Sequence, residues 1–205
     1  MNIFQMKTKP HGKERIREFI DGEFVCIGWP GIGDLTHTSK DEIRNRLKTV
    51  YNISGHKLGN SLGQVNTFVN AIKEGDIVFV TEKDWAYIGI AGDYHYNPHF
   101  DNNEEGMCHR RNIEWINRIL ISGLESSIQR LLSNRNTICQ YPETIEDSGL
   151  EKYLSNQSPI VKENSTKLDD LIQQALAVLE EELKSEDLDR RLKAATEIIR
   201  LKNNS

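Results

Sequence analysis

The stretch FVCIGWPGIGDL, residues 24–35, decides the fold that we expect. Its first four residues form an apolar run, which predicts a short buried strand. Three glycines and a proline at residues 28–33 then exclude a continuing strand or helix. The strand therefore leads into a structured loop that carries Trp29, in a segment too irregular to have been chosen for packing.

Short helices and short strands alternate along the chain on both sides of this loop. Helical spacing of apolar residues or a helix cap marks five segments: 15–20, 39–50, 60–72, 123–132 and 142–155. Strand-like apolar patterns mark four more: 77–80, 85–96, 110–116 and 137–140. Gly89 and Gly92 indicate a bulge, and residues 1–12 are expected to form a polar loop. The pattern predicts a small α+β domain with a strongly curved, barrel-like sheet.

The composition restricts the classes of protein. Of the 205 residues, 37% are hydrophobic and 28% charged, which is typical of a globular protein, and no long apolar run suggests a membrane span. The net charge is −5, from 26 basic and 31 acidic residues. An acidic chain is poorly suited to coating nucleic acid regardless of sequence, because neutralising phosphates supplies most of that affinity. A local basic patch or a pocket for one base stays open.

The cysteines and the first residues indicate a cellular setting. Cys26, Cys108 and Cys139 are odd in number and far apart, which indicates neither a disulfide framework nor a zinc ribbon. The first residues lack the apolar core of a signal peptide. We expect a reducing, cytoplasmic location, no membrane contact and no cofactor.

The C-terminal part has a different pattern from the rest. We expect a domain at 1–155, a linker at 156–165 and a helical hairpin at 166–205, with Ser185 capping its second helix. Its first helix carries an apolar stripe: Leu168, Leu171, Ile172, Ala175, Leu179 and Leu183. An exposed stripe promotes aggregation, so something must cover it. We predict a homodimer through paired hairpins; the rival is a hairpin folded back on its own domain.

Five segments, taken in order, resemble one known kind of domain. They are CIGWPGIGDL (26–35), GNSLGQ (59–64), KEGD (73–76), IGIAGDY (88–94) and HRRNIEW (109–115). The set resembles the N-terminal domain of Mrr-type restriction endonucleases and, more distantly, is similar to EVE and YTH domains of the PUA-like superfamily. This resemblance implies a PUA-like β-barrel with helices on its rim. It also implies an aromatic pocket for one modified nucleobase, used to detect modified foreign DNA.

In this sequence no recognisable nuclease domain follows the resembling region. We therefore expect a non-enzymatic module that recognises a modified base in DNA, with RNA as the alternative, in a defence- or restriction-related setting and with a separate nuclease as a further partner. A base pocket needs aromatic faces for stacking and amides or hydroxyls that read the base edge. Trp29 is the first candidate for stacking, and Trp85 and Tyr94 on the long predicted strand are the next.

Polar candidates lie at the expected start of the helix at 60–72. Asn60 and Ser61 are good helix caps, and a helix N-terminus also presents free N–H groups to a ligand. Gln64 follows one turn later, and its amide suits a base edge. Arg110 and Arg111 lie in the most basic stretch and are candidates for contacts with the nucleic-acid backbone, although a solvated strand end is the plainer interpretation.

Enzymatic interpretations have weaker support. A metal-dependent nuclease needs acids and a lysine on adjacent strands, whereas Glu182, Leu183 and Lys184 have the right spacing within an expected helix. The spacing of His95, His99, Cys108 and His109 fits no standard metal site. A metal-dependent nuclease, a nucleotide-processing enzyme and a protein that sequesters a small nucleotide remain the alternatives.

Overall fold

The computed structural model describes residues 1–154, 178–179, 182–185 and 187–203, and the chain divides into two units, 1–160 and 161–205. The second unit contains α7 (Leu188–Asn203). Asp187, rather than the predicted Ser185, caps this helix, because its Oδ1 accepts a hydrogen bond from the N–H of Asp189 at 2.9 Å. The predicted stripe from Leu168 to Ala175 lies outside the described residues, so the hairpin stays a prediction.

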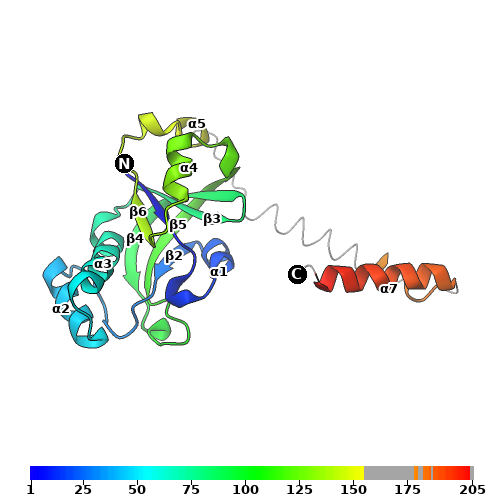
Figure 1. The fold of residues 1–205 in the computed structure, drawn as a ribbon, viewed down its shortest axis with the longest axis horizontal. Coiled ribbons are helices and arrows are strands. Elements are labelled where there is room, and N and C mark those ends of the chain that lie inside the picture. The colour runs from blue at the N-terminus through cyan, green and yellow to red at the C-terminus, as the bar shows by residue number, and fades with distance from the viewer. Residues whose placement is uncertain (155–177, 180–181, 186, 204–205) are drawn as a thin grey trace. The chain divides into compact units, whose positions relative to one another are not determined.

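The first unit is built on one six-stranded sheet, in the order β2-β5-β4-β3-β1-β6 (Figure 1). Its strands are β1 (Ile3–Met6), β2 (Phe24–Ile27), β3 (Ile77–Glu82), β4 (Trp85–Tyr96), β5 (His109–Leu120) and β6 (Ile138–Gln140). Neighbours are antiparallel except β1 and β3, which run parallel. Within the described residues no pairing joins the edge strands β2 and β6, so the sheet is open. The predicted α+β class is confirmed.

Strand β1 corrects the prediction of a polar loop at residues 1–12. All four of its residues are buried, and it lies between β3 and β6 inside the sheet. Gln5 interrupts the apolar run, so the hydrophobic pattern of the sequence did not indicate a strand here. Its side chain is 0% exposed, and its amide has no hydrogen-bond partner in the described part of the chain. Burial of a polar residue was the feature that the sequence could not indicate.

The helices lie mainly at two ends of the sheet (Figure 1). They are α1 (Ile16–Asp21), α2 (Lys40–Tyr51), α3 (Gly55–Asn66), α4 (Ser126–Leu132) and α5 (Glu151–Leu154). A π-helical turn at Thr67–Ala71 continues α3. Ser39 caps α2 by accepting from the N–H of Glu42 at 3.3 Å, but Glu42 pairs with Arg46 instead of completing the capping box. Helix α3 begins at Gly55, well before the predicted Asn60.

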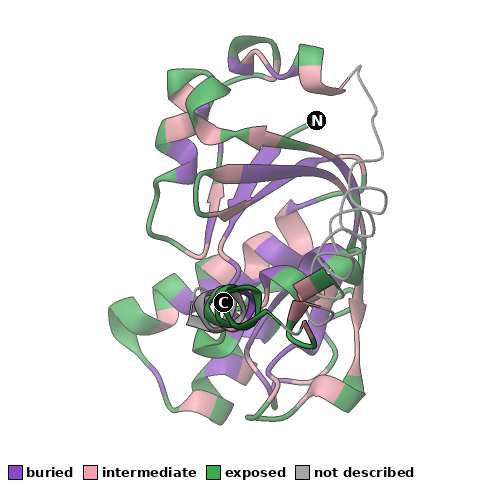
Figure 2. Cartoon of the chain, turned by 90° about the vertical axis from the view of Figure 1, so that its right-hand side faces the viewer, coloured by how far each residue is buried: buried purple, intermediate pink, exposed green. Residues whose placement is uncertain are grey.

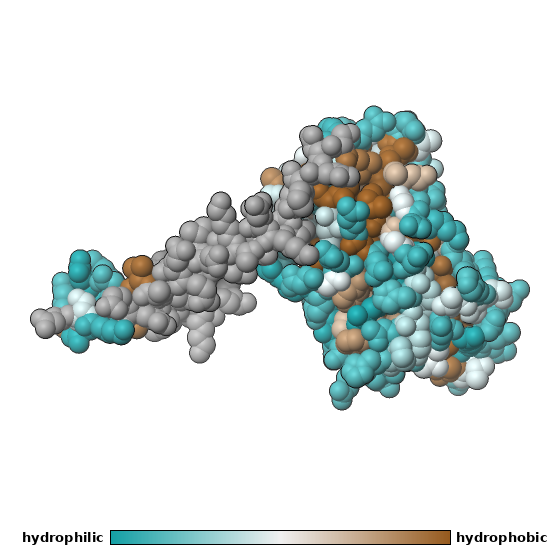
Figure 3. Space-filling view, turned by 180° about the vertical axis from the view of Figure 1, so that it is seen from behind, coloured by the Kyte–Doolittle hydropathy of each residue, from teal (hydrophilic) through white to brown (hydrophobic). Residues whose placement is uncertain are grey.

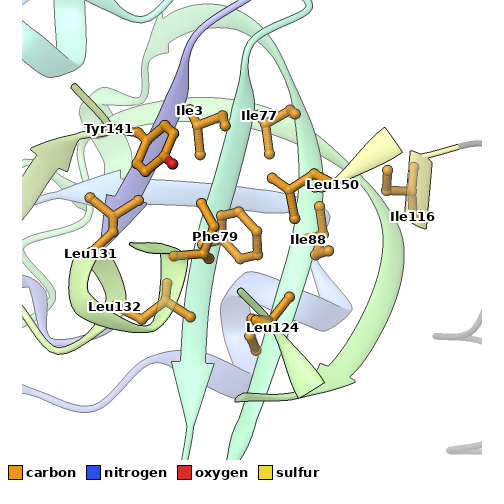
Figure 4. Close-up of a cluster of buried hydrophobic side chains, with 12 residues drawn as sticks. Ile3, Ile77, Phe79, Ile88, Ile116, Leu124, Leu131, Leu132, Tyr141 and Leu150 are labelled. Atoms are coloured by element: carbon orange, nitrogen blue, oxygen red, sulfur yellow. The ribbon is translucent and has the colours of Figure 1, made fainter. Parts of the chain in front are cut away.

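The core on one face of the sheet joins the strands to α4. Ile3, Ile77, Phe79 and Ile88 project from β1, β3 and β4 toward Leu131 and its neighbours on α4 (Figure 4). Strands β1 and β2 are completely buried, whereas the longer strands β4 and β5 and the helices are only partly buried (Figure 2). Burial of one such side chain contributes about 1.5–3 kcal/mol, so this layer fixes the sheet against α4.

The long β4–β5 pair carries the predicted bulge. Its register shifts between Ile88 and Gly89 and again between Ala91 and Tyr94. A Cβ on Gly89 would lie 2.1 Å from Ile113 Cγ2, so the close approach of the strands requires glycine there. Trp115, predicted to be core, is 7% exposed, and its Nε1–H donates to the Phe19 carbonyl at 3.0 Å. This bond ties β5 to α1.

The surface of the first unit is uneven. Seen from behind, it is mainly hydrophilic toward the end where α2 and α3 lie, and apolar side chains gather toward the end of α4 and α5 (Figure 3). No helix among the described residues is long and apolar enough to cross a membrane.

Candidate functional site

The loop after β2 is held in an unusual backbone conformation. Trp29 has a φ of 77°, in the left-handed region that non-glycine residues rarely adopt, and Gly31 and Gly33 follow with φ of 86° and 69°. Such a conformation costs free energy and persists only where its surroundings enforce it. The loop, residues 28–35, therefore depends on contacts from other elements.

Side chains of α2 and of Asp101 hold carbonyls and an N–H group of this loop. The Tyr51 hydroxyl, at the end of α2, donates to the Pro30 carbonyl at 2.6 Å. The N–H of Gly31 donates to Asp101 Oδ1 at 2.6 Å. Arg46 of α2 donates to the carbonyls of residues 32 and 34. These bonds fix the path of the loop and hence the position of the Trp29 ring.

His109 of β5 makes the most buried of these contacts. It is 0% exposed, and its Nε2 lies 3.4 Å from the Trp29 carbonyl, which only accepts. Nε2 therefore carries the proton, and Nδ1 accepts from the Tyr94 hydroxyl at 2.9 Å. Tyr94 in turn accepts from the N–H of Leu35 at 3.3 Å. Burial lowers the pKa of His109 to about 4, so the imidazole is neutral at neutral pH.

A cavity of about 230 Å³, here called the Trp29 cavity, lies beside the loop. Its lining includes Trp29, Tyr51, Gln64, Lys7, Lys9 and His11. The rings of Trp29 and Tyr51 meet edge to face, with centroids 5.0 Å apart and planes at 79°. A flat ligand in this cavity can thus stack on only one of the two rings.

Among the described residues, the lining of the Trp29 cavity includes Lys7, Lys9 and His11 but no aspartate or glutamate. Lys7 Nζ donates to the Leu132 carbonyl at 3.3 Å, and Lys9 lies 3.7 Å from Glu14 in an exposed ion pair. Cys26 also lines the cavity, and burial raises the pKa of its thiol far above neutrality, so it is a poor nucleophile. The cavity suits binding of an anion-bearing group better than covalent chemistry.

The predicted residues of α3 are only partly brought together. Gln64 lines the Trp29 cavity, as the base-pocket hypothesis requires. Because α3 begins at Gly55, Asn60 and Ser61 lie inside the helix, and neither caps it. Ser61 is 6% exposed and faces the protein interior, whereas Asn60 is exposed.

The aromatic candidates on β4 lie at opposite ends of the strand. Tyr94 supports the loop through its hydroxyl and does not line the Trp29 cavity. Trp85 pairs with Leu120 at the far end of the hairpin, where the Arg118 guanidinium lies 4.3 Å from its ring centroid. Trp85 is therefore not part of this site.

The two arginines predicted to contact nucleic acid are committed to the protein. Arg111 is 3% exposed and donates to three carbonyls: those of Phe68, Val69 and Gly92. Arg110 is half-buried between the rings of Phe24 and Phe100, 4.3 Å and 4.0 Å from their centroids. Burial of Arg111 leaves no donor for a phosphate, which corrects the prediction for that residue. The stacking of Arg110 favours a structural role.

Sequence reasoning missed Tyr51, Lys7 and the supporting role of His109. Tyr51 ends an amphipathic helix, Lys7 lies in the segment taken for a loop, and His109 follows a polar stretch. No pattern in the sequence joins these three positions, because they come from α2, the end of β1 and β5. The described part of the chain contains no group of three or more His, Cys, Asp or Glu side chains that would hold one metal ion.

Comparison with known proteins identifies a family but no activity. Residues 4–140 match the family described as "Domain of unknown function (DUF8426)", and the chain belongs to that family. This region contains all six strands of the sheet apart from the first residue of β1. No curated protein and no solved structure is similar enough to match the chain.

Proposed function

We propose that the first unit is a recognition module for one modified nucleobase in DNA, held in the Trp29 cavity. The observation that carries this proposal is the lining of that cavity, where an aromatic ring, an amide and basic side chains meet and no described residue is an acid. Aromatic stacking contributes about 1–3 kcal/mol per base, and an amide pairs with a base edge.

The size of the cavity agrees with a small flat ligand. Its volume of about 230 Å³ is below the range of roughly 300–1,000 Å³ typical of drug-sized ligands. Lys7, Lys9 and His11 are placed to attract the phosphates that flank a base. An extruded base, which enzymes and readers of single bases use, brings such phosphates with it.

We also propose that the fold is PUA-like, with a curved open sheet in place of a complete barrel. The bulges at Gly89 and Ala91–Tyr94 curve the β4–β5 pair. The aromatic loop after β2 and the helices on the rim match the arrangement that the resemblance implies. A defence- or restriction-related role and a separate nuclease partner are part of the same proposal.

Matched duplexes test the proposal. The full chain is titrated with duplexes that differ only in one base: cytosine, methylcytosine, hydroxymethylcytosine, adenine or methyladenine. Preference for one modified duplex without cleavage in magnesium or manganese supports recognition. Metal-dependent cleavage supports the nuclease alternative, and affinity for free nucleotides alone supports sequestration. Equal, weak binding to all duplexes contradicts the proposal.

The predicted homodimer is a second part of this proposal. In the second unit, Leu188 and Leu192 are 69% and 66% exposed, as expected of a surface that another copy covers. Two linked weak sites bind more tightly than one, because the second contact becomes intramolecular. Light scattering on the full chain and on a chain ending at Pro159 tests this prediction. A monomeric full chain contradicts it.

A further inference from the structure

A second cavity adjoins the Trp29 cavity and shares a wall with it. This cavity, here called the amide cleft, has a volume of about 290 Å³ and is lined by Gly59, Asn60, Gly63, Gln64, Asn136 and Ile138. Gln64 lines both cavities. Thr137, which lines the Trp29 cavity, stands between Asn136 and Ile138 in the sequence. Helix α3 and the segment that enters β6 thus contribute residues to both cavities.

Three carboxamides without a partner among the described residues line the amide cleft, two of them on the exposed residues Asn60 and Asn136. Within the described residues, the side chains of Asn60, Gln64 and Asn136 make no hydrogen bond. Asn136 bonds only through its backbone N–H, which donates to Asn134 Oδ1 at 3.0 Å. A carboxamide has two donors and an acceptor, so each is free to pair with a ligand. No charged residue in the described part of the chain lines the cleft, which favours a base edge over a phosphate.

Helix α3 contributes two glycines, Gly59 and Gly63, to the lining of the amide cleft. A Cβ at Gly59 or Gly63 would meet no atom within 4 Å, so packing inside the described chain does not require glycine at either position. A glycine inside a helix costs about 0.5–1 kcal/mol relative to alanine. Two such residues facing one cleft leave room for a group that the chain itself does not supply.

We propose that the amide cleft holds the nucleotide next to the base in the Trp29 cavity. This inference rests on the proposed function and makes it more specific: the ligand is a polynucleotide strand, and one free nucleotide fills only half of the site. Gln64 stands between the two positions. Its amide contacts the first base, and Asn60 and Asn136 contact the second.

Binding of short ligands tests the inference. The probes are the mononucleotide of the preferred modified base and the dinucleotide that adds one neighbour, each titrated against the full chain. One more base contact through a carboxamide predicts about ten-fold tighter binding of the dinucleotide. Equal affinities overturn the inference but leave a base pocket standing. Binding of neither probe, together with no binding of the modified duplex, overturns the proposed function as well.

Substitution at Gly63 separates the two cavities. Gly63→Met places a side chain in the amide cleft, where there is space for it, and we expect a loss of about ten-fold in dinucleotide affinity with mononucleotide affinity unchanged. His56→Met, at an exposed position of α3 outside both linings, is the matched control. Circular dichroism and urea unfolding confirm that both variants fold. A folded Gly63→Met variant that binds the dinucleotide as the unsubstituted chain does overturns the inference.

Discussion

Two groups of polar side chains surround α3 and the loop after β2, and they differ in how their hydrogen bonds are used. Behind the loop, Tyr94, His109 and Arg111 are bonded to the protein, and the last two are almost completely buried. In the amide cleft, Asn60, Gln64 and Asn136 have no side-chain partner among the described residues. The first group therefore maintains the fold, and the second is available to a ligand. Substitutions in the first group should therefore change stability, and substitutions in the second should change ligand binding.

The largest effect is expected from removing the Arg111 guanidinium. Arg111→Met leaves the carbonyls of Phe68, Val69 and Gly92 without their donors in a buried site. An unsatisfied buried group costs about 1–3 kcal/mol, so the free energy of unfolding should fall by about 3 kcal/mol or more. Urea denaturation measures it. Arg118→Met, at an exposed position stacked on Trp85, is the control and should change stability by about 0.5 kcal/mol or less.

Acid should destabilise the protein through His109. Its pKa is about 4 in the folded protein and 6.5 in the reference state, so the unfolded chain binds the additional proton between these values. The free energy of unfolding should therefore fall as the pH drops from 6.5 to 4, by roughly 3 kcal/mol in total. The pKa of Asp101 is lowered: burial opposes this, but hydrogen bonds from Tyr96 and Gly31 outweigh it, so Asp101 contributes only to further loss at lower pH.

Urea denaturation across this pH range measures the effect, with His109→Gln as the comparison. The glutamine variant should be less stable at pH 7 and should show a smaller slope between pH 6.5 and 4, to which His95, whose pKa is also lowered by burial, still contributes. A flat profile in the unsubstituted chain, or an equal slope in the variant, would show that the buried imidazole does not govern acid stability.

Trp29→Ala tests the contribution of the Trp29 ring to ligand binding. If the ring stacks on a base, the affinity for the preferred duplex should fall by about 1–3 kcal/mol. Titration of the duplex, with urea denaturation in parallel, separates this from a loss of stability. A variant that fails to fold would instead make Trp29 a plug of the domain, and stacking in the cavity would have to come from Tyr51.

Gln64→Ala should have a smaller, more specific effect. Removing the amide should reduce discrimination between modified and unmodified bases by about 1 kcal/mol, with stability changed by less than about 0.5 kcal/mol. Comparison of two matched duplexes measures it. Unchanged discrimination in a folded variant would remove Gln64 from the proposed contacts.

Gly63→Ala is expected to have the smallest effect, and it should raise the free energy of unfolding where the other substitutions lower stability or binding. Its methyl group meets no atom within 4 Å, and alanine is the better helix former, so the free energy of unfolding should rise by about 0.5–1 kcal/mol. Thermal unfolding detects the shift. A loss of stability would mean that the glycine serves packing and not the cleft.

The sequence predicted the elements that follow a clear apolar pattern. Strand β2, the loop with Trp29, strand β4 with its bulge and helix α2 all lie close to where they were expected. Strand β1 was missed because Gln5 breaks its apolar run, and the start of α3 was misplaced because glycines fill its first turns. Hydrophobic spacing says nothing about a buried amide or about a helix whose exposed face carries glycines.

The sequence could predict only those site residues whose side-chain type by itself suggests a contact with a ligand. Trp29 and Gln64 were both named as candidates, and the structure places them in one cavity. Arginine in a basic stretch was a poor guide, because Arg111 satisfies carbonyls inside the protein. Tyr51 and Lys7 joined the site through the packing of α2 and the path of β1, which no local pattern contains.

The most direct test of the base pocket is ultraviolet crosslinking of the full chain to its best-bound duplex, followed by mass spectrometry of the crosslinked peptide. Aromatic residues stacked on a base are the expected points of attachment. The account predicts attachment at Trp29 or Tyr51, which line the Trp29 cavity. Attachment only at Trp85, at the far end of β4, would contradict it.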